Sequence, residues 1–179
     1  NQHYFNPRLD LNREHNMMDQ LEALDEFVSK GWEIKDVMID GWASPEGEET
    51  FNEGLSERRA NTAKDVLVRR FNKLDETSFE EAKDLNWKLV AHGPDWNGFV
   101  ERVRNSDIDD KQPILNVVKF SAPDRREEEI RNMILIYPSL LDEILPPLRR
   151  SKIVVNAYEP KRTDEEIARL ATSQPGELT

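Results

Sequence analysis

The feature that most constrains the fold of this chain is a strand-like segment that leads through a small-residue loop into a long helix. Residues 34–42 place Val37 and Ile39 on one face at the spacing of a strand. Residues 43–47 form a loop of sequence Ala-Ser-Pro-Glu-Gly, and the apolar spacing that follows predicts a helix over 50–74. A strand, a loop rich in backbone N–H groups and a helix with arginines near its start form an arrangement suited to an anionic ligand.

Apolar spacing and turn residues predict further elements on both sides of this unit. They are a short strand over 4–9, a helix from the N-cap Asn12 to Gly31, a strand over 86–92, short helices over 96–103 and 114–120, a periodic helix over 124–136, a helix over 138–145 ended by Pro146 and Pro147, and a last strand over 149–158. This order predicts an α+β fold with one mixed sheet and helices on one face.

Composition narrows the classes of partner. The formal net charge of the 179 residues is -11, which argues against nucleic acid or anionic lipid as a bulk partner. The chain has no cysteine, and its three histidines lack the spacing of metal ligands, so we expect neither a metal site nor another cofactor. A capping box at 163–166 opens a short helix in the tail 159–179, which we expect to be the start of a further module.

The residues suited to ligand binding lie in the loop, in the first turns of the helix and before the last strand. They are Ser44, Glu46, Gly47, Asn52, Arg59, Arg149 and Arg150. Arg59 follows Leu55 by four residues and so shares its core-facing side more closely than Arg58 does. A buried arginine is costly without a partner, and we expect it to meet an acidic residue or a ligand carboxylate. The alternative is a solvated Arg58–Arg59 pair balanced by acidic residues at neighbouring turns.

The order of these residues resembles the signature of the OmpA-like peptidoglycan-binding domain. That signature reads Gly-aromatic-Thr-Asp-x-x-Gly and then Asn-x-x-Leu-Ser-x-x-Arg-Ala. The matching residues here are Gly41-Trp42-Ala43-Ser44-Pro45-Glu46-Gly47, Asn52 and Leu55-Ser56-Glu57-Arg58-Arg59-Ala60. The resemblance covers 1–74 and 148–158 well and 87–93 loosely, so it implies an OmpA-like domain over 1–158 with a helical insertion at about 95–145.

The resemblance also implies roles for single residues. In the family, the loop aspartate and the arginine before the alanine hold meso-diaminopimelate of the peptidoglycan stem peptide. By position, Arg59 would hold the ligand carboxylate, and Arg149 and Arg150 match the late Arg-Arg of the family. Ser44 stands where the family has its aspartate, and a serine cannot neutralise an ammonium group. Glu46 or Glu48 of the same loop would then supply the carboxylate.

Two functions follow as expectations. The first is non-enzymatic binding of peptidoglycan by a periplasmic domain of a Gram-negative protein, associated with the outer membrane through parts outside this chain. The second is a protein-interaction module on the same fold, with a degenerate ligand site, that contacts envelope or adhesin-assembly proteins through residues 95–145 and the tail 159–179. An Arg59 that points into an open pocket with Ser44 and Glu46 on its rim favours the first function. An internally paired Arg59, with the insertion covering the pocket, favours the second.

Overall fold

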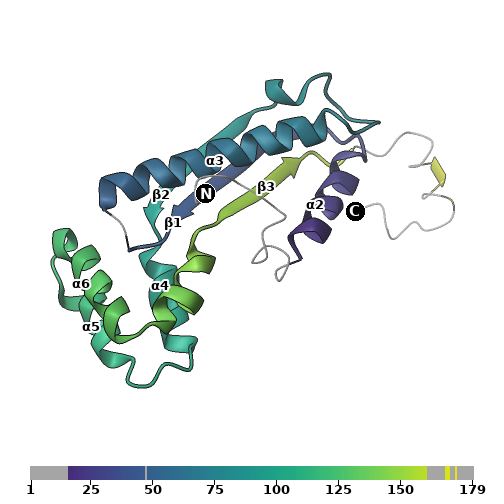
Figure 1. Ribbon diagram of the computed structural model, residues 1–179. Helices are drawn as coiled ribbons and strands as arrows, with labels where there is room; N and C mark the ends of the chain where they lie inside the picture. Colours follow the sequence, from purple (N-terminus) through teal and green to yellow (C-terminus); the bar gives the residue numbers. More distant parts are fainter. Residues whose placement is uncertain (1–15, 47, 161–167, 170–171, 173–179) are drawn as a thin grey trace.

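The computed structural model describes residues 16–46, 48–160, 168–169 and 172 (Figure 1). Its elements in chain order are α2 (Met17–Val28), β1 (Ile34–Ala43), α3 (Glu49–Phe71), the 3-10 helix η1 (Ala82–Asp84), β2 (Trp87–Pro94), α4 (Trp96–Asn105), α5 (Gln112–Phe120), α6 (Pro123–Ile136), the π-helical segment η2 (Leu140–Ile144), the 3-10 helix η3 (Pro146–Leu148) and β3 (Ser151–Ala157). The predicted α+β class is confirmed.

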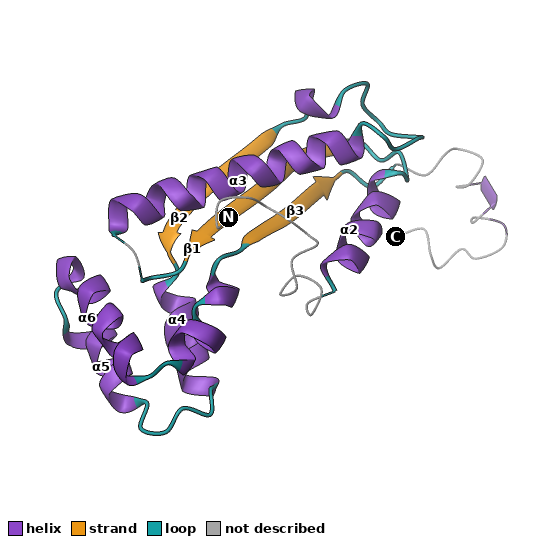
Figure 2. Ribbon diagram, viewed as in Figure 1, coloured by secondary structure: helices purple, strands orange, loops and turns teal. Residues whose placement is uncertain are grey.

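The three strands form one mixed sheet in the order β2-β1-β3 (Figure 2). β1 runs parallel to β2, with Ile39 opposite Leu89, and antiparallel to β3, with Ile39 opposite Ile153. These three side chains therefore share one face of the sheet. They pack with buried residues of α2 and α3 in one core, so both helices cover the same face.

The long helix α3 packs closely on the central strand at Gly41. A Cβ atom added there would lie 2.2 Å from the backbone oxygen of Ser56 and 3.3 Å from the Cβ of Ala60. The strand and the helix can meet at this distance only because Gly41 has no side chain. The contact sets the start of α3, where the candidate ligand residues lie, directly against the end of β1.

A second core lies wholly within residues 96–148, which we call the helical unit. Its buried members are Phe99, Val103, Ile114, Val117, Ile130, Leu140, Ile144, Leu145 and Leu148. None of them belongs to the core between the sheet, α2 and α3. Figure 1 shows α4, α5 and α6 beyond one end of the sheet, the end at which β2 stops and β3 begins.

Most predicted elements are found in place, with differences at their ends. The strand predicted over 86–92 continues to Pro94, which pairs with Ala43 after a register shift that leaves one extra residue in β2. The helix predicted over 138–145 is a single π-helical turn, in which Leu145 N–H donates to Leu140 O at 2.9 Å. Pro146 does not end the helical path but begins η3, since proline is well tolerated in a first helical turn.

Some predictions concern other parts of the chain. The strand over 4–9, the N-cap at Asn12 and the capping box at 163–166 lie outside the described residues. Among the residues that are described, no helix has the length and the apolar character that crossing a bilayer requires.

On the sheet face opposite α3, Asp36 is a buried carboxylate held by two neighbouring strands. It accepts hydrogen bonds from Lys88 Nζ at 2.7 Å and from Asn156 Nδ2 at 2.6 Å. These partners, Lys88 first and Asn156 second, hold the pKa of Asp36 below its ordinary value. The ionised form of Asp36 is therefore bound more favourably in the folded state than in the unfolded one.

We expect Asp36→Asn to lower the melting temperature at neutral pH. Because the folded pKa is lowered, the contribution of Asp36 is complete above the ordinary aspartate value of about 3.9 and is lost as the pH falls through the folded pKa. The difference from wild type should thus shrink in acid, as thermal melts across pH 2–7 would show. Asp65→Asn, at an exposed site on α3, is the control. A difference between wild type and Asp36→Asn that stayed constant with pH would contradict this account.

Candidate functional site

Arg149, which lies just before β3, forms hydrogen bonds with the loop after β1. Arg149 Nε donates to Ser44 Oγ at 2.9 Å, and Arg149 Nη2 donates to Glu46 Oε1 at 2.5 Å. Ser44 is buried, whereas the side chains of Arg149 and Glu46 keep 22% and 23% of their exposure. The fold thus joins residues about a hundred positions apart in the sequence.

Arg59 lies beside this cluster on the third turn of α3. It is 6% exposed, as its spacing from Leu55 predicted, and its Nη1 donates to Trp42 O at 2.6 Å. Burial lowers the pKa of Arg59 to about 10, and the nearby positive charge of Arg149 adds to the effect, while Glu46 opposes it. Arg59 remains charged at neutral pH, but its charge costs the folded state free energy.

The cluster of Arg59, Arg149 and Glu46 has more positive than negative charge. Glu46 offers one carboxylate oxygen to Arg149, and its other oxygen, Oε2, is buried and has no hydrogen-bond partner among the residues that the structure describes. A buried carboxylate oxygen without a donor is unusual in a folded protein. The described part of the site therefore combines two guanidinium groups with one acceptor oxygen to which none of the described residues donates.

The remaining loop residues have different positions. Asn52 is 2% exposed in the first turns of α3, and its N–H donates to Glu48 O at 2.8 Å as part of the helix. Asn52 therefore lies close to the loop in sequence, and its side chain is buried. Gly47, the predicted loop glycine, lies outside the described residues.

Arg150 makes its contacts away from Ser44 and Glu46. It forms an ion pair with Asp95, and its guanidinium carbon lies 4.6 Å from the centre of the Trp42 ring. Trp42 also stacks on His92, with ring centres 4.5 Å apart and planes 7° apart. The Trp42 ring thus packs against two side chains of the protein, Arg150 and His92.

Asp95 is a site residue that was not predicted from the sequence. This buried residue caps α4 by accepting from Gly98 N–H at 2.9 Å, and it also binds Arg150. Its position after Gly93-Pro94 and before a predicted helix is the usual one for an N-cap, which is the signal that was available. The pairing with Arg150, 55 residues away, has no such local signal.

In the described part of the chain, no group of three or more histidine, cysteine or acidic side chains could hold a metal ion. Comparisons with protein-family models, curated proteins and solved structures found no match to this chain.

Proposed function

We propose that this chain is an OmpA-like domain that binds the diaminopimelate-containing stem peptide of peptidoglycan non-covalently. The observation that carries the proposal is the cluster of two arginines and one incompletely bonded glutamate at the junction of β1, α3 and β3. Arg59 has the position of the ligand-binding arginine in the family signature that this sequence resembles. Burial disfavours the charged form of Arg59, and a ligand carboxylate would favour it.

In this proposal Glu46 takes the role that the family gives to its loop aspartate. The ligand carboxylate would bind to Arg59 and Arg149, whose like charges lie close together. The ligand ammonium would bind to Glu46 Oε2, to which no described residue donates a hydrogen bond. Ser44 would act indirectly, because its hydroxyl accepts from Arg149 Nε and so orients that guanidinium.

The proposal extends to location and class. We infer a periplasmic domain of a Gram-negative protein, associated with the outer membrane through parts outside this chain. Binding in this form needs no chemical step, so we propose a non-enzymatic anchor or sensor of the cell wall. Peptidoglycan is then the partner, and nucleic acid is not.

Arg59→Met tests the proposal because it removes the charge and keeps a long side chain. Loss of one charge-assisted contact should weaken binding of a diaminopimelate-containing muropeptide at least about tenfold. The free energy of unfolding should change by no more than about 2 kcal/mol, because the relieved burial cost offsets the lost bond to Trp42 O. Titration calorimetry and denaturant unfolding measure the two effects.

Arg69→Met is the matched control, since Arg69 is exposed on the same helix. It should retain wild-type affinity for the muropeptide and for purified sacculi. Glu46→Gln should lose most of the affinity for the zwitterionic ligand, because a glutamine cannot neutralise an ammonium group. Failure of the wild-type domain to bind sacculi above the Arg59→Met level would reject the proposed function.

A second candidate function, a protein-interaction module, is favoured by two observations. Arg59 is already hydrogen-bonded within the protein at Trp42 O rather than lying open to solvent. The helical unit has its own core and exposes Phe120, Leu135 and Ile136. If sacculi are not bound, we propose envelope or adhesin-assembly proteins as partners of this unit.

A further inference from the structure

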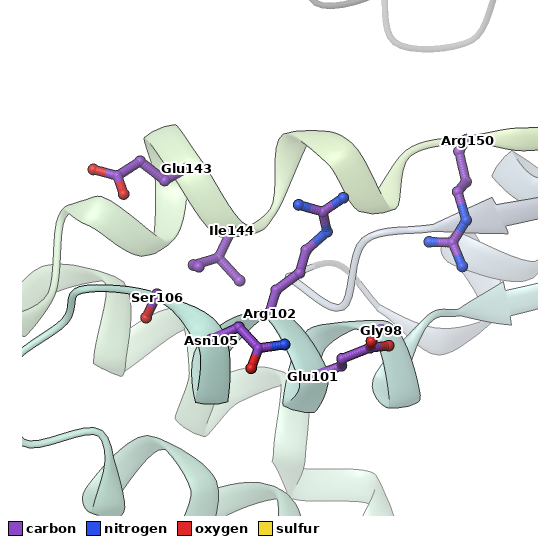
Figure 3. Close-up of a pocket in the computed structure, with 8 residues that line it drawn as sticks. All are labelled: Gly98, Glu101, Arg102, Asn105, Ser106, Glu143, Ile144 and Arg150. Atoms are coloured by element: carbon purple, nitrogen blue, oxygen red, sulfur yellow. The ribbon is translucent and has the colours of Figure 1, made fainter. Parts of the chain in front are cut away.

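A groove separates α4 from the segment that runs through η2 to the start of β3 (Figure 3). Its volume is about 470 Å³, within the range of pockets that bind small molecules. Its lining includes Glu101, Arg102, Asn105, Glu143 and Arg150. Arg150 and Arg149 are consecutive, yet Arg149 contacts the loop after β1 and Arg150 lines this groove, so the groove is separate from the Arg59 site.

Two arginines extend into the groove. Figure 3 shows the guanidinium groups of Arg102 and Arg150 directed toward the space between α4 and the start of β3. Arg102 is exposed and has no hydrogen bond or ion pair within the described part of the chain. Arg150 is oriented by Asp95 and Trp42, and its side chain still has 42% of its exposure. The Arg150 guanidinium is thus held in place, and the N–H groups of the Arg102 guanidinium can donate to a ligand.

The charges around the groove restrict the class of ligand. Its lining combines Arg102 and Arg150 with Glu101 and Glu143, and the buried Asp95 lies against Arg150. The two positive charges are outnumbered by these three negative ones, so the site as a whole repels phosphate-rich polyanions. A ligand with one carboxylate and several N–H groups matches both kinds of side chain, because guanidinium groups bind carboxylates and glutamates accept from N–H groups.

We propose that this groove binds a peptide through a carboxylate, which Arg102 and Arg150 hold together. The Asn105 amide donates to a peptide carbonyl, and Glu101 accepts from a peptide N–H. The carboxylate comes either from the end of a chain or from an acidic side chain. Arg102 and Asn105 lie on α4 and take no part in the cluster around Arg59, so substitutions of Arg102 test this groove separately from the peptidoglycan site.

The test uses three short peptides and the full chain labelled with 15N. N-acetyl-Ala-Ala-Ala carries a free terminal carboxylate, N-acetyl-Ala-Asp-Ala-amide carries a side-chain carboxylate, and N-acetyl-Ala-Ala-Ala-amide carries none. We expect the amide resonances of Gly98 and Asn105 to shift with at least one of the first two peptides and not with the third. The tighter of the two carboxylate peptides identifies the source of the carboxylate.

Arg102→Gln should weaken this binding at least tenfold, whereas Arg104→Gln, the same change at an exposed site of α4 outside the groove, should leave it unchanged. Equal shifts with the amidated Ala-Ala-Ala peptide would overturn the proposal. The same conclusion would follow if Arg102→Gln bound as well as wild type, or if no groove resonance moved with any peptide. Muropeptide binding by Arg102→Gln should remain intact, so failure of this groove is distinguishable from failure of the Arg59 site.

Discussion

Gly41→Ala is expected to destabilise the protein by about 3 kcal/mol or more, because overpacking on this scale displaces backbone rather than side chains. The new Cβ would lie 2.2 Å from Ser56 O, an atom in the middle of a helical turn that cannot move alone. Either α3 shifts away from β1 or the strand bends, and both changes open the core between them. Denaturant unfolding followed by circular dichroism would measure the loss.

Gly54→Ala separates this clash from a general effect of replacing glycine. An added Cβ at Gly54 lies 3.2 Å from the guanidinium of Arg58, which is the flexible end of a side chain. Alanine is favoured over glycine inside a helix by about 0.5–1 kcal/mol, so this variant should be slightly more stable than wild type. If Gly41→Ala melted at the wild-type temperature, the close packing of α3 on β1 would be incorrect.

The second large effect is expected for Phe99→Ala in the helical unit. Phe99 is fully buried, packs edge-to-face against Trp96, and lies in the core that contains no residue of the sheet. Truncating a buried phenylalanine costs about 3–5 kcal/mol. Because the two cores share no members, we expect the loss to appear mainly within residues 96–148.

Hydrogen exchange resolves the two regions. In Phe99→Ala, amide protection should fall in α4, α5 and α6 and remain near wild type in β1 and α3. Phe120→Ala is the matched control in the same unit, because Phe120 is 70% exposed and its removal leaves no buried cavity. Equal loss of protection in the sheet and in the helical unit would mean that the two cores unfold together.

The sequence predicted most of the fold because the main elements have strong local periodicity. β1 alternates buried and less buried residues, the second half of α3 buries Ala63, Leu67 and Phe71, and the burial of Arg59 followed from its spacing with Leu55. Ends and irregular turns were less predictable. Pro94 continues a strand because it lies at the edge of the sheet, where its missing N–H costs little. The π-helical turn at η2 has no spacing of apolar residues that distinguishes it from an α-helix.

The candidate site was predictable in its residue types and only in part in its pairings. Ser44, Glu46 and Arg59 are near one another in sequence, and a shared loop and helix bring them together. The partners Glu46 and Arg149 are 103 positions apart, so only the antiparallel pairing of β3 with β1 places them in contact. Arg149 and Arg150 lie between η3 and β3, and their separate contacts, with Glu46 and with Asp95, likewise join residues far apart in the sequence.

The ion pair between Asp95 and Arg150 has a consequence for how this chain can change. Asp95 immediately precedes the helical unit and Arg150 lies just after it. The backbone of each is also hydrogen-bonded to the end of β1. Asp95 N–H donates to Ala43 O, and Trp42 N–H donates to Arg150 O, both at 2.9 Å. The two ends of the chain segment that forms the helical unit are thus both anchored on the end of β1. We therefore expect the helical unit to be replaceable as a cassette without a change in the register of the sheet.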